Sequence, residues 1–120
     1  MRTAALVALL AEARPIVIDT VSNSWGRSIP GVIGLKFAGL GDSFADASQG
    51  RLRRKMLEPT AGDLRRPVVT VGWNSERFHG HNLALRLAAL GYTQVYWYRG
   101  GREAWEVAGQ PETAFGVQEW

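Results

Sequence analysis

The sequence predicts an α/β domain whose mostly parallel sheet is covered by helices on both faces, in three layers. Short runs rich in apolar and β-branched residues alternate with longer helix-like stretches, and this alternation is typical of parallel sheets. Some runs are apolar at nearly every position, as in strands that are buried on both faces. With 120 residues, the chain suits one domain over residues 1–120 that needs neither a metal nor a disulfide for stability.

The first segment, "MRTAALVALLAEA" (1–13), predicts a helix packed on the sheet. The alternative is a weak secretory signal, because an apolar run follows Arg2 and small residues precede Arg14. The single basic residue at the start, together with Glu12, favours the helix. We therefore expect a cytoplasmic protein, with the periplasm as the alternative. No stretch is as long as a membrane span, so no membrane association is predicted.

Two short strands are predicted next. "PIVIDT" (15–20) is almost wholly apolar and ends in Asp19, which suits a strand covered on both faces. A loop at 22–28 separates it from "IPGVIGL" (29–35), where a Pro-Gly turn leads into the second strand.

A second helix is predicted from a start signal and a stop signal. Ser43 and Asp46 resemble a capping box in which Asp replaces the usual Glu or Gln. We expect this helix to run to about Glu58, where Pro59 stops it. Within it, "RLRRK" (51–55) indicates an exposed face, and contact with nucleic acid is the less favoured interpretation.

The strongest strand signal is "RRPVVTVG" (65–72), and an amphipathic helix, "NLALRLAALG" (82–91), follows after a polar loop. Gly91 is the expected end of this helix. The residues expected on its apolar face are Leu83, Ala84, Leu87 and Ala88.

The last strand and helix flank a pair of glycines. "QVYWYR" (94–99) is rich in aromatic and β-branched residues and predicts a strand. A tight turn at 100–101 leads into "REAWEVAG" (102–109), a short helix. Trp97 and Trp105 are expected in the core.

The loop "GWNSERF" (72–78) is the candidate site, because ligands of parallel α/β sheets bind beyond the carboxyl ends of the strands. The turns after Asp19 and Arg99 end at the same edge. We therefore expect Gly100 and Gly101 to lie beside this loop.

Five segments carry a resemblance to a known family: "IVIDT", "IPGVIGL", "PVVTVG", "LALRLAALGY" and "VYWYRGGREAWEVAGQP". Together they resemble rhodanese-like domains of the sulfurtransferase superfamily, with the core at about residues 16–111. In that family the third of these segments ends in a catalytic cysteine, which carries sulfur as a persulfide. The resemblance implies the family's fold and a sulfur-carrying loop at residues 72–78.

The departures from the family pattern decide the expected function. Gly72 stands where the family places its cysteine, and a shift of one residue would give Val71 or Trp73 instead. The chain contains no cysteine at all, so no residue can carry the sulfur. Val21 also replaces the arginine that commonly follows the aspartate of the first strand. We therefore predict a degenerate member with no catalytic residue of the family kind.

The residues left in the loop define a predicted ligand site. Arg77 matches the family's loop arginine, which faces a bound anion, and its alternative is a solvated arginine. Asp19 and Arg99 are predicted to support the site, although Asp19 is equally suited to forming a turn. The predicted ligand-binding residues are Trp73, Asn74, Ser75, Glu76, Arg77 and His79.

Four side chains of this region have competing interpretations. Ser75 could act as a nucleophile with His79 or Glu76 as its base, but a hydroxyl that bonds the local backbone is favoured. Trp73 could plug the pocket or offer a flat face to a ligand, and ordinary packing is favoured. His79 and His81 have no obvious third ligand, so no metal is predicted.

The favoured function is a non-catalytic binding or regulatory module that retains an anion-binding loop, with a protein or a small anion as partner and no cofactor. The first alternative is a cysteine-independent enzyme, either a serine-based hydrolase or a phosphatase-like enzyme. A nucleic-acid binder is the third and least favoured hypothesis, because the net charge of +3 is a mild excess.

Overall fold

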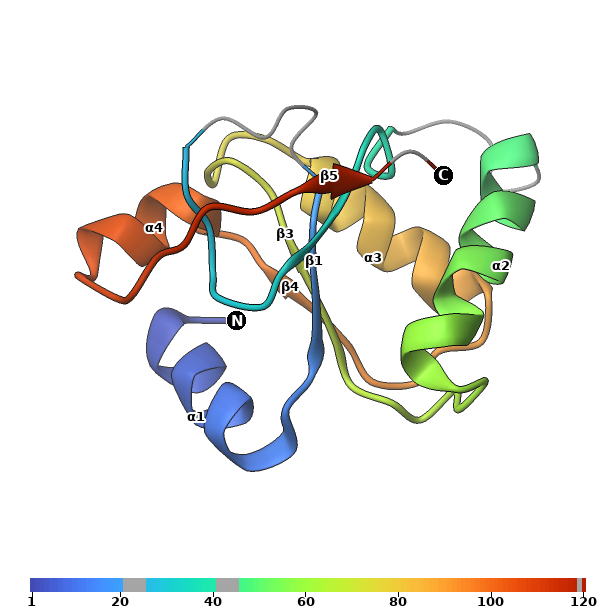
Figure 1. Cartoon of the computed structure of the whole chain (residues 1–120), viewed down its shortest axis with the longest axis horizontal. Helices are drawn as coiled ribbons and strands as arrows, with labels where there is room; N and C mark the ends of the chain where they lie inside the picture. Colours follow the sequence, from blue (N-terminus) through green and yellow to red (C-terminus); the bar gives the residue numbers. More distant parts are fainter. Residues whose placement is uncertain (21–25, 41–45, 119) are drawn as a thin grey trace.

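The protein folds into a five-stranded parallel sheet with strand order β4-β3-β1-β2-β5, as the computed structural model shows (Figure 1). The structure describes residues 1–20, 26–40, 46–118 and 120. The elements are α1 (Thr3–Ala13), β1 (Ile16–Asp19), β2 (Ile33–Leu35), α2 (Ala47–Thr60), β3 (Val68–Val71), α3 (His79–Ala89), β4 (Val95–Tyr98), α4 (Gly101–Val107) and β5 (Val117–Gln118). The predicted α/β class and parallel sheet are confirmed.

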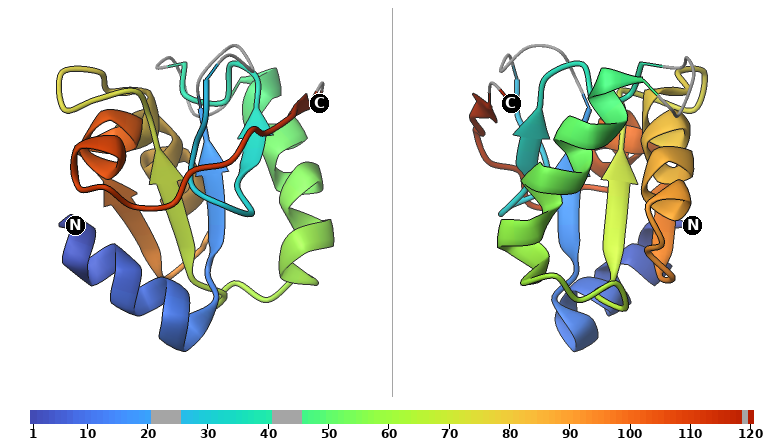
Figure 2. Two further views of the ribbon diagram at one scale, coloured as in Figure 1. Left: turned by 60° about the vertical axis from the view of Figure 1, so that its left-hand side comes forward. Right: turned by 90° about the vertical axis from the view of Figure 1, so that its right-hand side faces the viewer.

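Helices cover both faces of the sheet, with α1 and α4 on one face and α2 and α3 on the other (Figure 2). The alternation of side chains along the strands builds a core on each face. Ile16 and Ile18 of β1 join the core beneath α2 and α3. Val17, between them, joins the core beneath α1 and α4. This explains why the strand is apolar at successive positions.

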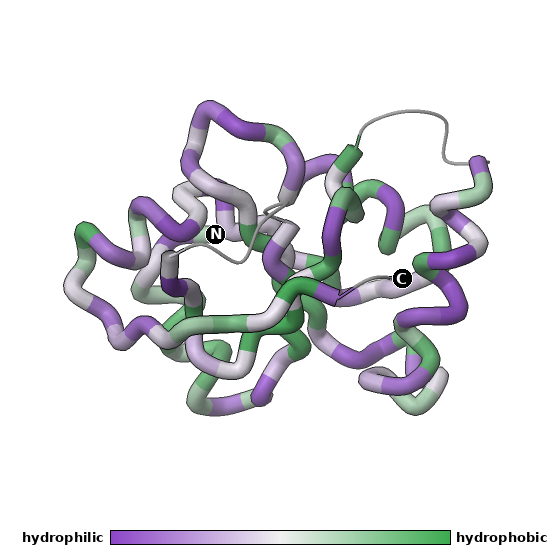
Figure 3. The backbone as a smooth tube through the Cα atoms, turned by 45° about the horizontal axis from the view of Figure 1, so that its top comes forward, coloured by the Kyte–Doolittle hydropathy of each residue, from purple (hydrophilic) through white to green (hydrophobic). Residues whose placement is uncertain are grey.

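The first and third strands pair in register and end at the same edge of the sheet. Ile16 pairs with Val68, and Asp19 pairs with Val71. When the backbone is coloured by hydropathy, hydrophobic segments cross the middle of the molecule and many hydrophilic residues lie toward its periphery (Figure 3). The carboxyl ends of β1 and β3 therefore open onto one polar edge.

Helix α2 differs from its predicted limits at both ends. Asp46 is the N-cap, and its carboxylate accepts a hydrogen bond from the Gln49 N–H at 3.0 Å. Ser43, the other predicted capping residue, lies outside the described residues, as does Val21. The expectation that Pro59 stops the helix at Glu58 was wrong, because the helix runs through Pro59 to Thr60. The Thr60 hydroxyl donates to the Met56 carbonyl at 2.6 Å, which satisfies a carbonyl of this last turn.

The limits of other strands and helices also differ from the predicted ones. The second strand begins at Ile33, since Ile29 precedes a turn in which the Val32 N–H bonds the Ile29 carbonyl at 3.2 Å. Helix α3 begins at His79, before the apolar stretch that predicted it. The short strand β5 was not predicted, because two residues show no periodicity.

The predicted apolar face of α3 is only half right. Leu83 and Leu87 are fully buried, whereas Ala88 is exposed. Arg86 is buried instead, with 1% of its surface exposed, because it lies between α3 and the start of α2. Helix α3 therefore makes a polar contact with α2 and packs its apolar residues against the sheet.

The two tryptophans predicted in the core differ in their environments. Trp105 is buried, and its indole N–H donates to the Pro111 carbonyl at 2.7 Å. Trp97 is only partly buried, because it lies on β4, an edge strand of the sheet. Among the helices in the described part of the chain, none is both long and apolar enough to cross a membrane.

Candidate functional site

The loop of residues 72–78 connects the end of β3 to the start of α3 at the carboxyl edge of the sheet (Figure 2). Its root is fixed by β1. The backbone N–H and the hydroxyl of Thr20 both donate to the Val71 carbonyl, at 2.9 and 3.0 Å. Gly72 is buried, whereas most of the following loop residues are exposed. The loop therefore has a rigid base and an accessible rim.

The start of α4 holds the same loop from its other side. The N–H of Arg102 donates to the Gly72 carbonyl at 3.0 Å, and the N–H of Glu103 donates to the Trp73 carbonyl at 3.1 Å. Gly101 has φ of +66°, and a methyl group there would lie 2.5 Å from the Gly72 carbonyl oxygen. The predicted position of Gly100 and Gly101 beside the loop is confirmed.

Asn74 organises the turn inside the loop. Its side-chain oxygen accepts the Glu76 N–H at 3.1 Å, and its carbonyl accepts the Arg77 N–H at 3.2 Å. An asparagine that bonds the backbone two residues ahead forms an Asx turn, which suits this residue type. Two hydrogen bonds therefore set the curvature of the loop just before Arg77.

Several backbone donors of the loop and of the next turn have no acceptor in the part of the chain that the structure describes. Among the described residues, no atom accepts the N–H groups of Trp73, Asn74 and Ser75, nor those of His79 and Gly80 in the first turn of α3. A loop with consecutive free N–H groups above a helix N-terminus attracts negative charge. This arrangement is suited to binding an oxyanion.

The position where the family carries its cysteine has space for a side chain. A Cβ atom on Gly72 would lie 3.5 Å from the Gly80 nitrogen and 3.8 Å from the Thr20 hydroxyl, which are ordinary van der Waals distances. The φ angle of Gly72 is not in the left-handed region. Neither the space for a Cβ atom nor the backbone conformation requires glycine at this position.

The charged residues of the loop are exposed. Within the described part of the chain, the side chains of Glu76 and Arg77 form no hydrogen bond or ion pair. Glu76 therefore does not neutralise Arg77 in this structure. The Arg77 guanidinium remains available to an anion from solvent.

The proposed serine nucleophile lacks the contacts that would activate it. Ser75 and His79 are both exposed. Among the described residues, no hydrogen bond joins the Ser75 hydroxyl to His79 or to Glu76. A serine nucleophile needs a base within hydrogen-bond distance, although such bonds can be longer in unliganded enzymes. The geometry gives no support to a serine-based hydrolase.

Trp73 lies against α4. The Arg102 guanidinium carbon is 5.1 Å from the centre of its ring, a cation–π distance. Trp73 also lines a cavity of about 310 Å³ between the loop and α4, together with Arg27 and Glu103. Its side chain is 48% exposed, so it packs on a cation without being part of the core.

Asp19 contacts Arg102, whose backbone N–H holds the loop. The Asp19 carboxylate is fully buried, accepts the Ser28 hydroxyl at 2.7 Å and lies 3.8 Å from the Arg102 Nε. Arg102 Nε also donates to the Arg27 carbonyl at 3.0 Å. Arg102 was not singled out from the sequence, although it directly follows the Gly-Gly turn of the family-like tail.

Arg99 contacts an aromatic group on the other side of the loop. Its guanidinium carbon lies 5.8 Å from the centre of the Trp97 ring. The Trp97 ring is 4.7 Å from that of His81 and 6.2 Å from that of Phe78, centre to centre. Arg99 therefore lies against the Trp97 ring, and none of its contacts described here is with the loop.

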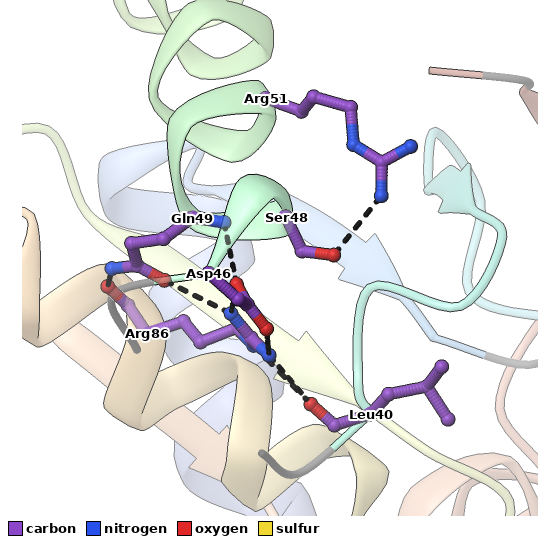
Figure 4. Close-up of polar contacts among 6 residues, drawn as sticks. All are labelled: Leu40, Asp46, Ser48, Gln49, Arg51 and Arg86. Carbon is purple, nitrogen blue, oxygen red and sulfur yellow. Dashed lines mark hydrogen bonds and ion pairs between the residues drawn. The ribbon is translucent and has the colours of Figure 1, made fainter. Parts of the chain in front are cut away.

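A buried arginine holds the helix that follows the loop. Arg86 donates to both Asp46 carboxylate oxygens, at 2.9 and 3.0 Å, and to the Leu40 carbonyl (Figure 4). Gln49 accepts one Arg86 hydrogen bond and donates one to the Arg86 carbonyl. The Arg86 guanidinium holds the pKa of Asp46 below its usual value. This contact joins α3 to the start of α2.

The Leu40 segment in turn touches the start of α3. A methyl group on Gly39 would lie 2.6 Å from the His79 Cβ, and the Asn82 amide donates to the Gly39 carbonyl at 3.0 Å. Arg86 and Asn82 therefore fix residues 39–40 against α3, next to its first turn. In the described residues, no group of three or more His, Asp or Glu side chains is placed to hold a metal ion.

Together, the parallel sheet and the loop between β3 and α3 define an α/β domain built around a loop at the carboxyl edge. The sequence model described as "Rhodanese-like domain" matches residues 3–108. The chain therefore belongs to the rhodanese-like domain family. The absence of cysteine makes it a degenerate member.

Solved structures agree with this assignment of the fold. A thiosulfate sulfurtransferase from Pseudomonas aeruginosa has a TM-score of 0.70 and 24% identity; the match covers 98% of this chain but only 20% of that one. A full-length protein from Lactobacillus plantarum has a TM-score of 0.69 and 18% identity, covering 96% of this chain and 87% of that one. A human single-domain sulfurtransferase has a TM-score of 0.62 and 19% identity; the match covers 89% of this chain and 94% of that one. The comparison with curated proteins found no match.

Proposed function

We propose that this chain is a non-catalytic rhodanese-like module whose loop at residues 72–78 binds a small oxyanion. The observation that carries the proposal is the loop itself: after a glycine in the cysteine position it keeps the exposed Arg77 and backbone N–H donors that have no acceptor among the described residues. The bound anion would serve a regulatory or structural purpose, because the chain has no thiol to react with it.

The chemistry of the family explains why an anion would remain the ligand. A persulfide is negatively charged, and the loop N–H groups and the helix start stabilise that charge. Replacing the cysteine by glycine removes the sulfur but leaves the donors. A rhodanese from E. coli with this fold, 14% identical and with a TM-score of 0.57, was solved with anions, which supports the proposal.

The first prediction concerns sulfur transfer. The purified protein is expected to show no thiosulfate:cyanide sulfurtransferase activity above that of buffer, because no residue can form a persulfide. Activity that copurifies with the protein and tracks its concentration would contradict the proposal.

The variant Gly72→Cys tests the loop independently of turnover. It is expected to fold with stability within about 1 kcal/mol of the parent protein, because a Cβ atom at this position meets no atom closer than 3.5 Å. The donors around it should lower the pKa of the introduced thiol by at least about one unit from its usual value of about 8.5. The pH dependence of alkylation by iodoacetamide measures that pKa, and a normal or raised value would show that the loop does not favour negative charge.

The second prediction concerns the anion. Titration with inorganic phosphate at tens of millimolar should shift the amide NMR signals of Asn74, Ser75 and Arg77. Arg77→Ala should weaken the binding about fivefold, because an exposed, charge-assisted contact is worth about 1 kcal/mol. The matched control is Arg53→Ala, on the exposed side of α2, which should bind phosphate as the parent does. Loop amides that stay still throughout the titration would rule the proposal out.

A further inference from the structure

An aromatic patch lies beside the first turn of α3. It consists of Phe78, His81 and Trp97, with Arg99 over the indole ring. The ring of Phe78 is 6.4 Å from that of His81, in an edge-to-face arrangement. Rings at these distances hold one another in place, so the patch is an ordered apolar surface.

The patch is open to solvent and carries positive charge around it. Phe78 is 53% exposed. Arg77 and Arg99 are exposed as well. Glu76 is the one acidic residue in the two segments that form the loop and the patch, residues 72–81 and 95–99. An exposed ring that follows Arg77 in the chain and packs near Trp97, which carries Arg99 over its indole, is complementary to a ligand that is both apolar and negatively charged.

The patch and the loop meet at Gly80. A Cβ atom on Gly80 would lie 3.0 Å from Trp97 Cδ1 and Nε1, and 3.2 Å from the Gly72 nitrogen. The edge of the indole and the base of the loop therefore face the same point. Trp97 Nε1 is buried there and has no hydrogen-bond partner among the described residues. The anion-binding loop and the aromatic patch are thus neighbouring parts of one surface.

We propose that the oxyanion taken by this loop carries an aromatic substituent, so that the ligand class is an aryl phosphate monoester. The inference rests on the proposed function, since the loop donors and Arg77 hold the phosphate group. A free inorganic anion uses those donors but leaves the aromatic patch uncovered. An aryl ester covers the exposed ring of Phe78, which removes apolar surface from water and adds an aromatic contact.

The test compares two probes on the same protein. Phenyl phosphate is expected to bind about tenfold more tightly than inorganic phosphate, measured from the amide NMR shifts of residues 73–81. Phe78→Ala should reduce this ratio to between about one and two, because alanine removes the ring without adding a hydroxyl that could cap the first turn of α3. Phe78→Leu should retain part of the ratio, because a larger apolar side chain remains. Leu57→Ala is the matched control, since Leu57 on α2 is 54% exposed and the ratio should not change.

The outcomes separate this inference from the proposed function. If neither probe shifts the loop amides, the proposed function fails. If inorganic phosphate binds but phenyl phosphate binds no more tightly, or if Phe78→Ala keeps the full ratio, the aryl ester is wrong while the anion site stands. A phosphotyrosine flanked by glycines forms a further arm. If this peptide binds as tightly as phenyl phosphate, the ligand is a small-molecule ester. If it binds more tightly, the ligand is a phosphorylated protein segment. Both results support an aryl phosphate ester.

Discussion

Replacing Gly101 by alanine is expected to destabilise the protein by about 2–4 kcal/mol. The new methyl group would lie 2.5 Å from the Gly72 carbonyl oxygen and 2.8 Å from the Trp73 backbone, where no atom can yield without moving the loop. The backbone at Gly101 also has φ of +66°, which costs an L-residue about 1–2 kcal/mol. Urea unfolding monitored by tryptophan fluorescence measures the loss.

Gly109→Ala separates the two causes. Gly109 has nearly the same backbone conformation, with φ of +70°, but nothing lies within 4 Å of the added methyl group. Gly109→Ala is expected to lower the free energy of unfolding by about 1 kcal/mol, from the left-handed conformation alone. Equal losses at both glycines would show that the contact between α4 and the loop does not constrain the site. NMR shifts at Trp73 should change only in the Gly101 variant.

Arg86→Met is expected to cost about 2–4 kcal/mol of the free energy of unfolding. The side chain is almost fully buried and donates hydrogen bonds to Asp46, Gln49 and the Leu40 carbonyl. Methionine fills much of the space but leaves buried acceptors without a donor, and such acceptors are costly. Arg51→Met is the control. Arg51 is exposed, donates to the Ser48 hydroxyl (Figure 4) and lies 5.3 Å from the centre of the Trp120 ring, so its replacement should cost less than about 1 kcal/mol of the free energy of unfolding.

The same ion pair predicts how stability depends on pH. The hydrogen bond from Arg86 lowers the pKa of Asp46 in the folded protein. The carboxylate therefore stabilises the fold fully above the ordinary pKa of an aspartate, and this contribution is lost as the pH falls through the lowered value. Arg86→Met should reduce the loss of stability between neutral and acidic pH. An unchanged pH profile would contradict a role for this pair.

The sequence was sufficient for the sheet and for the position of the candidate loop. Strands such as Ile16–Asp19 are apolar at successive positions because each of them faces two cores. The pairing of the Gly100–Gly101 turn with the loop also followed from the sequence alone, since both follow strands that end at one edge. These features depend on local pattern and on topology.

The features that were missed depend on partners far along the chain. Arg86 sits in an amphipathic helix where a charged residue is normally solvated, and its burial depends on Asp46, forty residues away in sequence. Arg102 likewise contacts Asp19 across the sheet edge. The aromatic patch joins Phe78 to Trp97 on a separate strand. No periodicity within a segment reports such contacts.

The space at Gly72 has an evolutionary consequence. Codons for glycine and cysteine can differ by a single base, so a thiol at this position is within easy mutational reach. A Cβ atom there lies at ordinary contact distances from its nearest neighbours, and the backbone is outside the left-handed region that favours glycine. Neither the backbone nor a Cβ atom therefore gives the fold a reason to exclude cysteine. A selection that keeps glycine would act on what the loop binds, or against the reactivity that a thiol would bring to it.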